Sequence, residues 1–212
     1  DRVRNAIGLP STAMRDVQTY AGQIQGMRHR DLIDQSTVQD LRDNNRADAL
    51  QQRFEDSCAP TSAQITRAEA DPIYARQLHQ NAIHGIAGGN PIATEQSNLL
   101  NAGGGGVGTA RPGPAGGGLS DPNVTTTLNN HVGPATNGRV FNYQNYPDNN
   151  STPATRAASQ SARGNALNRI DTQLRRGHDV PIGITWNGGG GHVVVMTDVR
   201  GQGNNRRYLV SD

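Results

Sequence analysis

The spacing of apolar residues changes once along this chain and divides it into two parts. Up to Gly177 the apolar positions recur mostly at three- and four-residue intervals on polar segments, which is typical of helices. This pattern predicts helices over residues 11–27, 36–54, 58–70, 120–132 and 153–176, and a helix or turn over 72–87. After Gly177, β-branched residues gather between Gly and Asn turns, which predicts strands over 179–186, 191–199 and 206–212.

This order of elements, with helices first and strands last, predicts an α+β fold rather than alternating βαβ units. We expect an N-terminal helical segment over residues 1–54 and a second domain over residues 55–212. The second domain contains a Gly-rich insertion at about residues 102–118, which we expect to be loop. The insertion lacks the Gly-Lys-Ser/Thr ending of a phosphate-binding loop, and the chain has no Lys that could supply it.

Composition and charge argue against several classes of protein. The net charge is only +2 and the basic residues are dispersed, which argues against a nucleic-acid-binding protein. No run approaches the roughly 20 apolar residues of a membrane span, and no apolar core of a signal peptide is present at the N-terminus. All 20 basic residues are Arg, which fits either codon bias or protection from ubiquitin attachment to Lys inside a eukaryotic cell. The chain does not begin with Met, so we expect it to be a processed form or a piece of a longer protein.

The chain has a single cysteine, Cys58, which excludes an internal disulfide framework and a multi-Cys zinc site. It stands where the helix over 58–70 should begin, with Asp56 or Ser57 as the expected cap and Pro60 in the first turn. The exposed N–H groups of a helix start stabilise a thiolate and lower its pKa, which makes a thiol nucleophilic.

A nucleophilic thiol needs a base, and His192 is the candidate because it alone of six His residues opens an apolar strand. The glycines before it fit a plain hairpin turn or the close approach of a substrate backbone. If the last two strands pair around Gln202, residue 192 faces residue 212, so Asp212 would hold the imidazole. Asp198 lies six residues along the same strand, roughly 20 Å away, and is the rival acid.

An acyl-transfer site also needs hydrogen-bond donors for the oxyanion. The backbone N–H of Cys58 is one candidate. Gln52, six residues before Cys58, is the second, although Gln52 and its neighbour Gln51 could both be solvated surface amides.

Together these residues resemble the papain-like cysteine peptidases, in particular the bacterial branch that cleaves double-glycine leader peptides. The resemblance rests on Gln-x5-Cys at a helix start, Gly-His opening a strand and Asp closing the next strand. The cysteine motif of that branch commonly reads Asp-Cys-Gly-Pro-Thr, whereas residues 56–61 read Asp-Ser-Cys-Ala-Pro-Thr. The interval from Cys58 to His192 is also longer, a feature of secreted bacterial effectors of this fold.

The resemblance implies a papain-like fold, with the nucleophile helix in a helical lobe and His192 and Asp212 on an antiparallel sheet. It implies a peptidase with the triad Cys58, His192 and Asp212, with Gln52 at the oxyanion and no metal or cofactor. The partner would be a protein or peptide substrate, and an immunity protein is an open question. We expect a bacterial effector or toxin acting in a reducing compartment such as the host cytosol. Glutamine deamidation, acyl transfer and cell-wall amide cleavage use the same chemistry, and a non-catalytic binding module is the alternative from another class.

Overall fold

The computed structural model describes residues 11–28, 50–84, 89–105, 118–136, 138–146, 152–186 and 190–211. Within these ranges the α+β class is confirmed. The helices are α2 (Ser11–Ile24), α4 (Cys58–Ala70), α5 (Pro72–His84), α6 (Pro91–Ala102), α7 (Asp121–His131) and α8 (Pro153–Leu174), with 3-10 turns η1 (Gly133–Thr136) and η2 (Gly203–Asn205). The strands are β1 (Val180–Thr185), β2 (Gly191–Arg200) and β3 (Arg207–Ser211).

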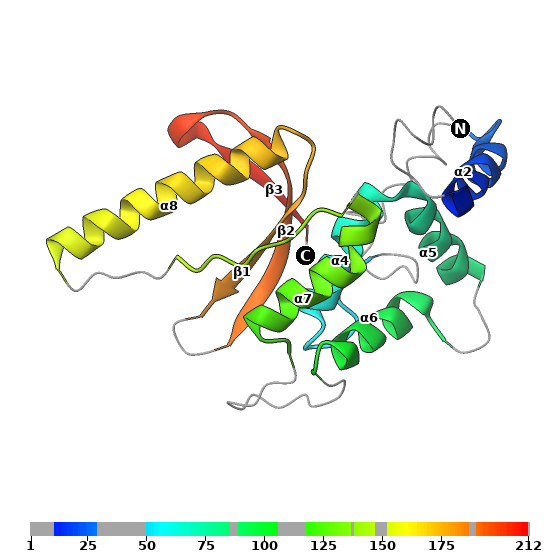
Figure 1. Cartoon of the computed structure of the whole chain (residues 1–212), viewed down its shortest axis with the longest axis horizontal. Coiled ribbons are helices and arrows are strands. Elements are labelled where there is room, and N and C mark those ends of the chain that lie inside the picture. Colours follow the sequence, from blue (N-terminus) through cyan, green and yellow to red (C-terminus); the bar gives the residue numbers. More distant parts are fainter. Residues whose placement is uncertain are drawn as a thin grey trace.

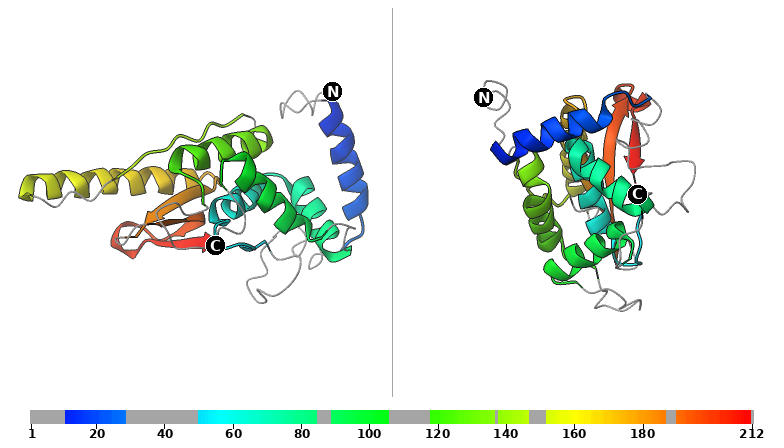
Figure 2. Two further views of the ribbon diagram at one scale, coloured as in Figure 1. Left: turned by 90° about the horizontal axis from the view of Figure 1, so that it is seen from below. Right: turned by 90° about the vertical axis from the view of Figure 1, so that its right-hand side faces the viewer.

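The three strands form one antiparallel sheet in the order β1-β2-β3, so β2 is its central strand. Helices α4 to α7 gather at one side of this sheet, and α8 extends away on the other side (Figures 1 and 2). The N-terminal half of α8 projects beyond the strands, and most of its residues are exposed. Across the described ranges, every helix is too short or too polar to cross a bilayer.

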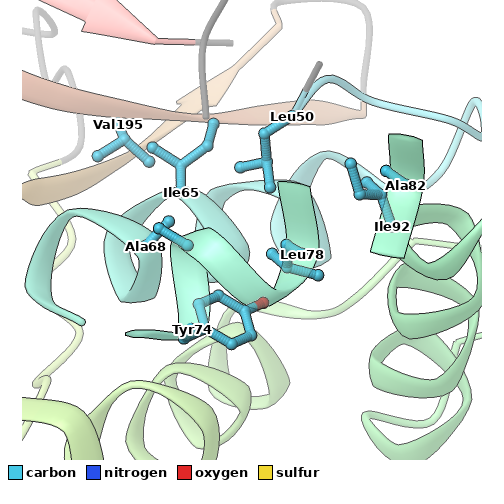
Figure 3. Close-up of a cluster of buried hydrophobic side chains, with 9 residues drawn as sticks. Leu50, Ile65, Ala68, Tyr74, Leu78, Ala82, Ile92 and Val195 are labelled. Atoms are coloured by element: carbon cyan, nitrogen blue, oxygen red, sulfur yellow. The ribbon is translucent and has the colours of Figure 1, made fainter. Parts of the chain in front are cut away.

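Helix α4 is the centre of the fold, because it packs against β2, α5, α6 and α7. Its side chains are mostly small, which lets these neighbours approach closely. The side of α4 that carries Ile65 contributes to the main apolar cluster, where Ile65 and Val195 of β2 lie close together (Figure 3). The other members of this cluster are Leu50, Ala68, Tyr74, Ala75, Leu78, Ala82 and Ile92.

Two helix starts follow from local capping. At α8, the Thr152 hydroxyl accepts a hydrogen bond from the Thr155 N–H at 3.2 Å, and the Thr155 hydroxyl accepts one from the Thr152 N–H at 2.9 Å. At α6, the Asn90 side chain accepts from the Ile92 N–H at 2.9 Å. Both helices have Pro at the next position, where a missing N–H costs no intrahelical bond.

Most of the predicted elements are confirmed, and α4 begins and ends at the predicted residues 58 and 70. The predicted helix over 36–54 is wrong at its end, because residues 50–53 have no helical structure and Leu50 is buried in the core. The rest of that helix lies outside the described residues. Helix α6 was not predicted.

Candidate functional site

Cys58 is the first residue of α4, as predicted, and its side chain is half-buried. Ser57 precedes the helix, and its carbonyl accepts the first helical hydrogen bond, from the Thr61 N–H at 2.8 Å. The Ser57 hydroxyl does not cap the helix and bonds elsewhere. The thiol therefore stands where a helix presents its unpaired N–H groups, which favours a negative charge on sulfur.

The first turns of α4 contact the beginning of β2. The Ser62 hydroxyl donates a hydrogen bond to the carbonyl of Val193 at 3.0 Å. The last described pair between β2 and β3 is Val195 with Ser211. Val193 lies beyond this pair, and its carbonyl accepts the hydrogen bond from Ser62 instead. Cys58 lies one helical turn before Ser62 and on the same helix face. The structure thus brings the helix face of Cys58 close to the strand segment next to His192.

His192 pairs with Ile184 of β1 near the end of the sheet. Side chains alternate along a strand, so His192 points to the sheet face opposite to that of Val195, which packs on α4. A contact between Cys58 and His192 would therefore form around the end of the sheet, where β2 begins, and not across its face.

The predicted register of the last two strands is wrong. Ser211 pairs with Val195, whereas the prediction pairs residue 211 with residue 193. Next to the turn the difference is three residues, because Arg200 pairs with Arg207 and not with residue 204, and a bulge between Met196 and Asp198 reduces it to two. Asp212 lies outside the described residues, so its role stays a prediction.

Asp198, the rival acid, is engaged locally. Its carboxylate accepts from the Val199 N–H at 2.7 Å and forms an exposed ion pair with Arg200 at 3.3 Å. It lies near the far end of β2 from His192. The structure therefore does not bring Asp198 to the candidate base.

Gln52 lies close to Cys58 in sequence but its amide group is bound within its own loop. Its Nε2 donates to the carbonyls of Phe54 and Glu55 at 2.7 and 2.5 Å. These two bonds use both amide hydrogens, so an oxyanion could receive one only after a carbonyl is released. The predicted oxyanion role of Gln52 stays a prediction.

Sequence reasoning missed a chain of buried polar side chains behind the Cys58 loop. Gln96 of α6 and Gln64 of α4 have no exposed surface and bond to each other, Nε2 of Gln96 donating to Oε1 of Gln64 at 3.0 Å. Gln64 in turn donates to Glu95 at 2.7 Å, and the Tyr74 hydroxyl donates to the same carboxylate oxygen at 2.5 Å. In the sequence these residues resemble the polar face of surface helices, so only their packing identifies them.

The last member of this series of buried polar side chains is His131 of α7. Arg67 faces His131 Nδ1 at 3.3 Å, and since a guanidinium can only donate, Nδ1 is the acceptor and the ring is neutral. His131 Nε2 lies 3.3 Å from the Tyr74 hydroxyl and 3.8 Å from the Glu95 carboxylate. Burial lowers the pKa of His131, the Glu95 carboxylate opposes this, and Arg67 adds to it. The Arg67 guanidinium also lies over the Tyr74 ring, 4.2 Å from its centre.

A polar surface hollow of about 400 Å³ lies between α8 and the β2–β3 turn. Its charged groups include Asp171 and Arg206, which pair with each other at 2.9 Å. Arg175 also lines the hollow, and its guanidinium donates to the Gly201 carbonyl at 2.7 Å.

Comparisons with protein-family models, with curated proteins and with solved structures found no match to this chain. In the parts of the chain that the structure describes, no three His, Cys, Asp or Glu side chains are grouped so as to hold a metal ion.

Proposed function

We propose that this chain is a thiol hydrolase of papain-like type that cleaves peptide bonds through Cys58 and His192, with Asp212 as the third residue. The observation that supports this most directly is the position of the only thiol at the start of α4. One turn further, Ser62 bonds the carbonyl next to His192. A helix start and an adjacent imidazolium both lower the pKa of a thiol.

The proposed reaction proceeds through a thioester. The Cys58 thiolate attacks the substrate carbonyl, and the C–N bond breaks as His192 gives its proton to the leaving amine. Water, deprotonated by His192, then hydrolyses the thioester and releases the acid. The Cys58 N–H at the helix start, with Gln52 after release of the Glu55 carbonyl, would stabilise the oxyanion. We propose that the substrate is a protein and that the enzyme is a bacterial effector or toxin active in a reducing compartment.

The first test measures the pKa of the Cys58 thiol, because a single cysteine makes alkylation by iodoacetamide readable from intact mass. We expect a pH profile with a midpoint well below the usual value of about 8.5. His192→Ala should raise that midpoint. His178→Ala is the matched control, since residue 178 precedes β1 at the other end of the sheet, about 20 Å along the strands from His192. A midpoint of about 8.5 that is the same in wild type and His192→Ala would favour a non-catalytic module instead.

The second test identifies the reaction. Wild type and Cys58→Ala are incubated with bacterial and eukaryotic lysates, and mass spectrometry compares new peptide termini. Termini that depend on Cys58 support a peptidase. Ammonia release with Gln-to-Glu mass changes would instead support a deamidase, and release of cell-wall fragments an amidase.

A further inference from the structure

Gln96 is a buried amide of α6 that forms hydrogen bonds with the loop before Cys58 and with α4. It lies in the buried stripe of the helix, with Ile92 and Leu100 one turn to either side, and all three are 0% exposed. The apolar neighbours anchor α6 in the core. An apolar side chain at position 96 would pack in the same stripe, so an amide there needs a specific explanation.

The Gln96 amide bonds the loop over residues 51–57, which leads into Cys58. Its Oε1 accepts from the Arg53 N–H at 2.9 Å and faces the Ser57 hydroxyl at 3.0 Å. Its Nε2 donates to the Gln51 carbonyl at 2.9 Å. Because a backbone N–H only donates and a carbonyl only accepts, these contacts fix the orientation of the amide.

The remaining amide hydrogen goes to Gln64, so every hydrogen-bonding group of Gln96 has a partner. Gln64 belongs to α4 itself, the helix that begins with Cys58. One buried side chain therefore connects α4 to both ends of the loop before it. A network of satisfied buried hydrogen bonds is rigid, whereas the loss of one member leaves its partners unpaired.

We infer that Gln96 is a positioning residue, which holds the 51–57 loop so that the start of α4 can stabilise the Cys58 thiolate. This inference rests on the proposed function. Gln96 does not touch the thiol and acts through the loop backbone. Its replacement should therefore change the pKa of Cys58 and not only the stability of the protein.

The test compares Gln96→Met with Gln64→Met by iodoacetamide alkylation of the full chain from pH 5 to 10. Both variants remove an equally buried amide from the same network, but the hydrogen bonds to the loop described above belong to Gln96. We expect Gln96→Met to raise the midpoint of the profile by about one pH unit, and so to slow alkylation at pH 6.5 several-fold. Gln64→Met should match wild type in this rate while losing a similar amount in melting temperature.

The midpoint of the pH profile, together with the alkylation rate at high pH, distinguishes a displaced helix start from a loosened core. A loosened core exposes the thiol and raises the limiting rate with little change in the midpoint. A displaced helix start raises the midpoint and changes the limiting rate only a few-fold, because a more basic thiolate is a better nucleophile. If Gln96→Met does not fold, Ser57→Ala removes one bond of the same contact and should give a smaller shift. Where both variants fold, their shifts should add only in part. Both interrupt the contact between Ser57 and Gln96, but Ser57→Ala also removes the bonds of its hydroxyl with Phe54.

The outcomes distinguish the two proposals. An ordinary thiol pKa in wild type contradicts the proposed function. A lowered pKa in wild type that Gln96→Met and Ser57→Ala leave unchanged overturns the role of Gln96 alone. Equal shifts in Gln96→Met and Gln64→Met also overturn it, because the effect would then belong to the core in general.

Discussion

Two carboxyl groups, Asp179 before β1 and Glu69 near the end of α4, interact in the folded chain. Burial, together with the nearby Glu69 carboxylate, raises the pKa of Asp179 to about 7. Burial also raises the pKa of Glu69. The fold thus favours the protonated form of Asp179, which the unfolded chain holds only at much lower pH.

Asp179→Asn should therefore stabilise the protein at alkaline pH. Between about pH 4 and pH 7 the folded state binds more protons at this site than the unfolded state, so wild type loses stability as the pH rises. Since solvent screens this partly exposed group, we expect a gain of about 1 kcal/mol at pH 8, or about 3 °C in melting temperature. Thermal melts at pH 4 and pH 8 check this, and an equal gain at both would contradict the assignment.

We expect substitutions of the two candidate acids, Asp212 and Asp198, to have different effects on kcat of the proposed reaction. Asp212→Asn should lower kcat about 10²-fold or more, because it removes the charge that stabilises the imidazolium. Asp198→Asn should leave kcat near wild type, since Asp198 bonds only to its own end of β2 among the described contacts. The rates are measured on the protein substrate found in the lysate experiment. A strong loss from Asp198→Asn alone would reverse the assignment.

At the scale of single elements, the start of α4 was predictable and α6 was not. The sequence around the start of α4 carries local helix-start signals, with Asp56 and Ser57 before the helix and Pro60 in its first turn. Helix α6 also begins with Asn90 as a capping residue, but a Gly-rich segment follows it and suggested loop. Its buried side includes an amide among apolar residues, which weakens the helical pattern.

The strand register failed for a different reason. Alternation of apolar residues predicts that β2 and β3 exist, but not where the chain turns between them, and the observed turn moves the pairing by three residues from the prediction. A bulge, which adds one residue to β2 without a clear sequence signal, reduces this difference to two. The extra residue lies between Met196 and Asp198. Cys58 could be singled out from the sequence as a candidate because it is the only thiol of the chain. The polar network could not be predicted, since Gln and Glu are usually exposed.

Protonation of His131 should weaken the contact between α7 and α4 and so lower the stability of the protein. The pKa of His131 is lowered, so below about pH 6.5 the unfolded chain binds the proton first and stability falls with further acidification. Protonation also removes the acceptor that faces Arg67. His131→Gln should cost about 1 kcal/mol at pH 7.5, and this difference from wild type should shrink at pH 5.

Urea unfolding at the two pH values measures that difference. His178→Gln is the control, because His178 lies in the turn before β1 and outside this network. A constant difference between wild type and His131→Gln would mean that the lost contacts are not linked to a proton.

In the whole molecule, the two ends of the Gly-rich segment meet. Gly103 has no room for a side chain, because a Cβ there would lie 2.7 Å from the Leu119 side chain and 3.1 Å from the Thr127 hydroxyl. At the other end, a Cβ on Gly118 would lie 3.9 Å from the carbonyl of Asp56. The residues on either side of the Gly-rich segment therefore contact each other without its help. The end at Gly118 lies next to the loop before Cys58.

Replacing residues 106–117 by a short Gly/Ser linker should therefore leave the protein folded. Loop closure depends weakly on length, so we expect a change of less than about 1 kcal/mol, or about 3 °C in melting temperature. The same replacement of residues 138–146 is the contrasting control. Phe141 in that segment packs on the cluster of Ala63, Leu128 and Val132, and Asn129 bonds its backbone N–H and carbonyl at 2.6 and 3.0 Å. We expect this second variant to melt far lower or fail to fold. Similar losses in both variants would show that residues 106–117 contribute to the core, and that the insertion is not separable from the fold.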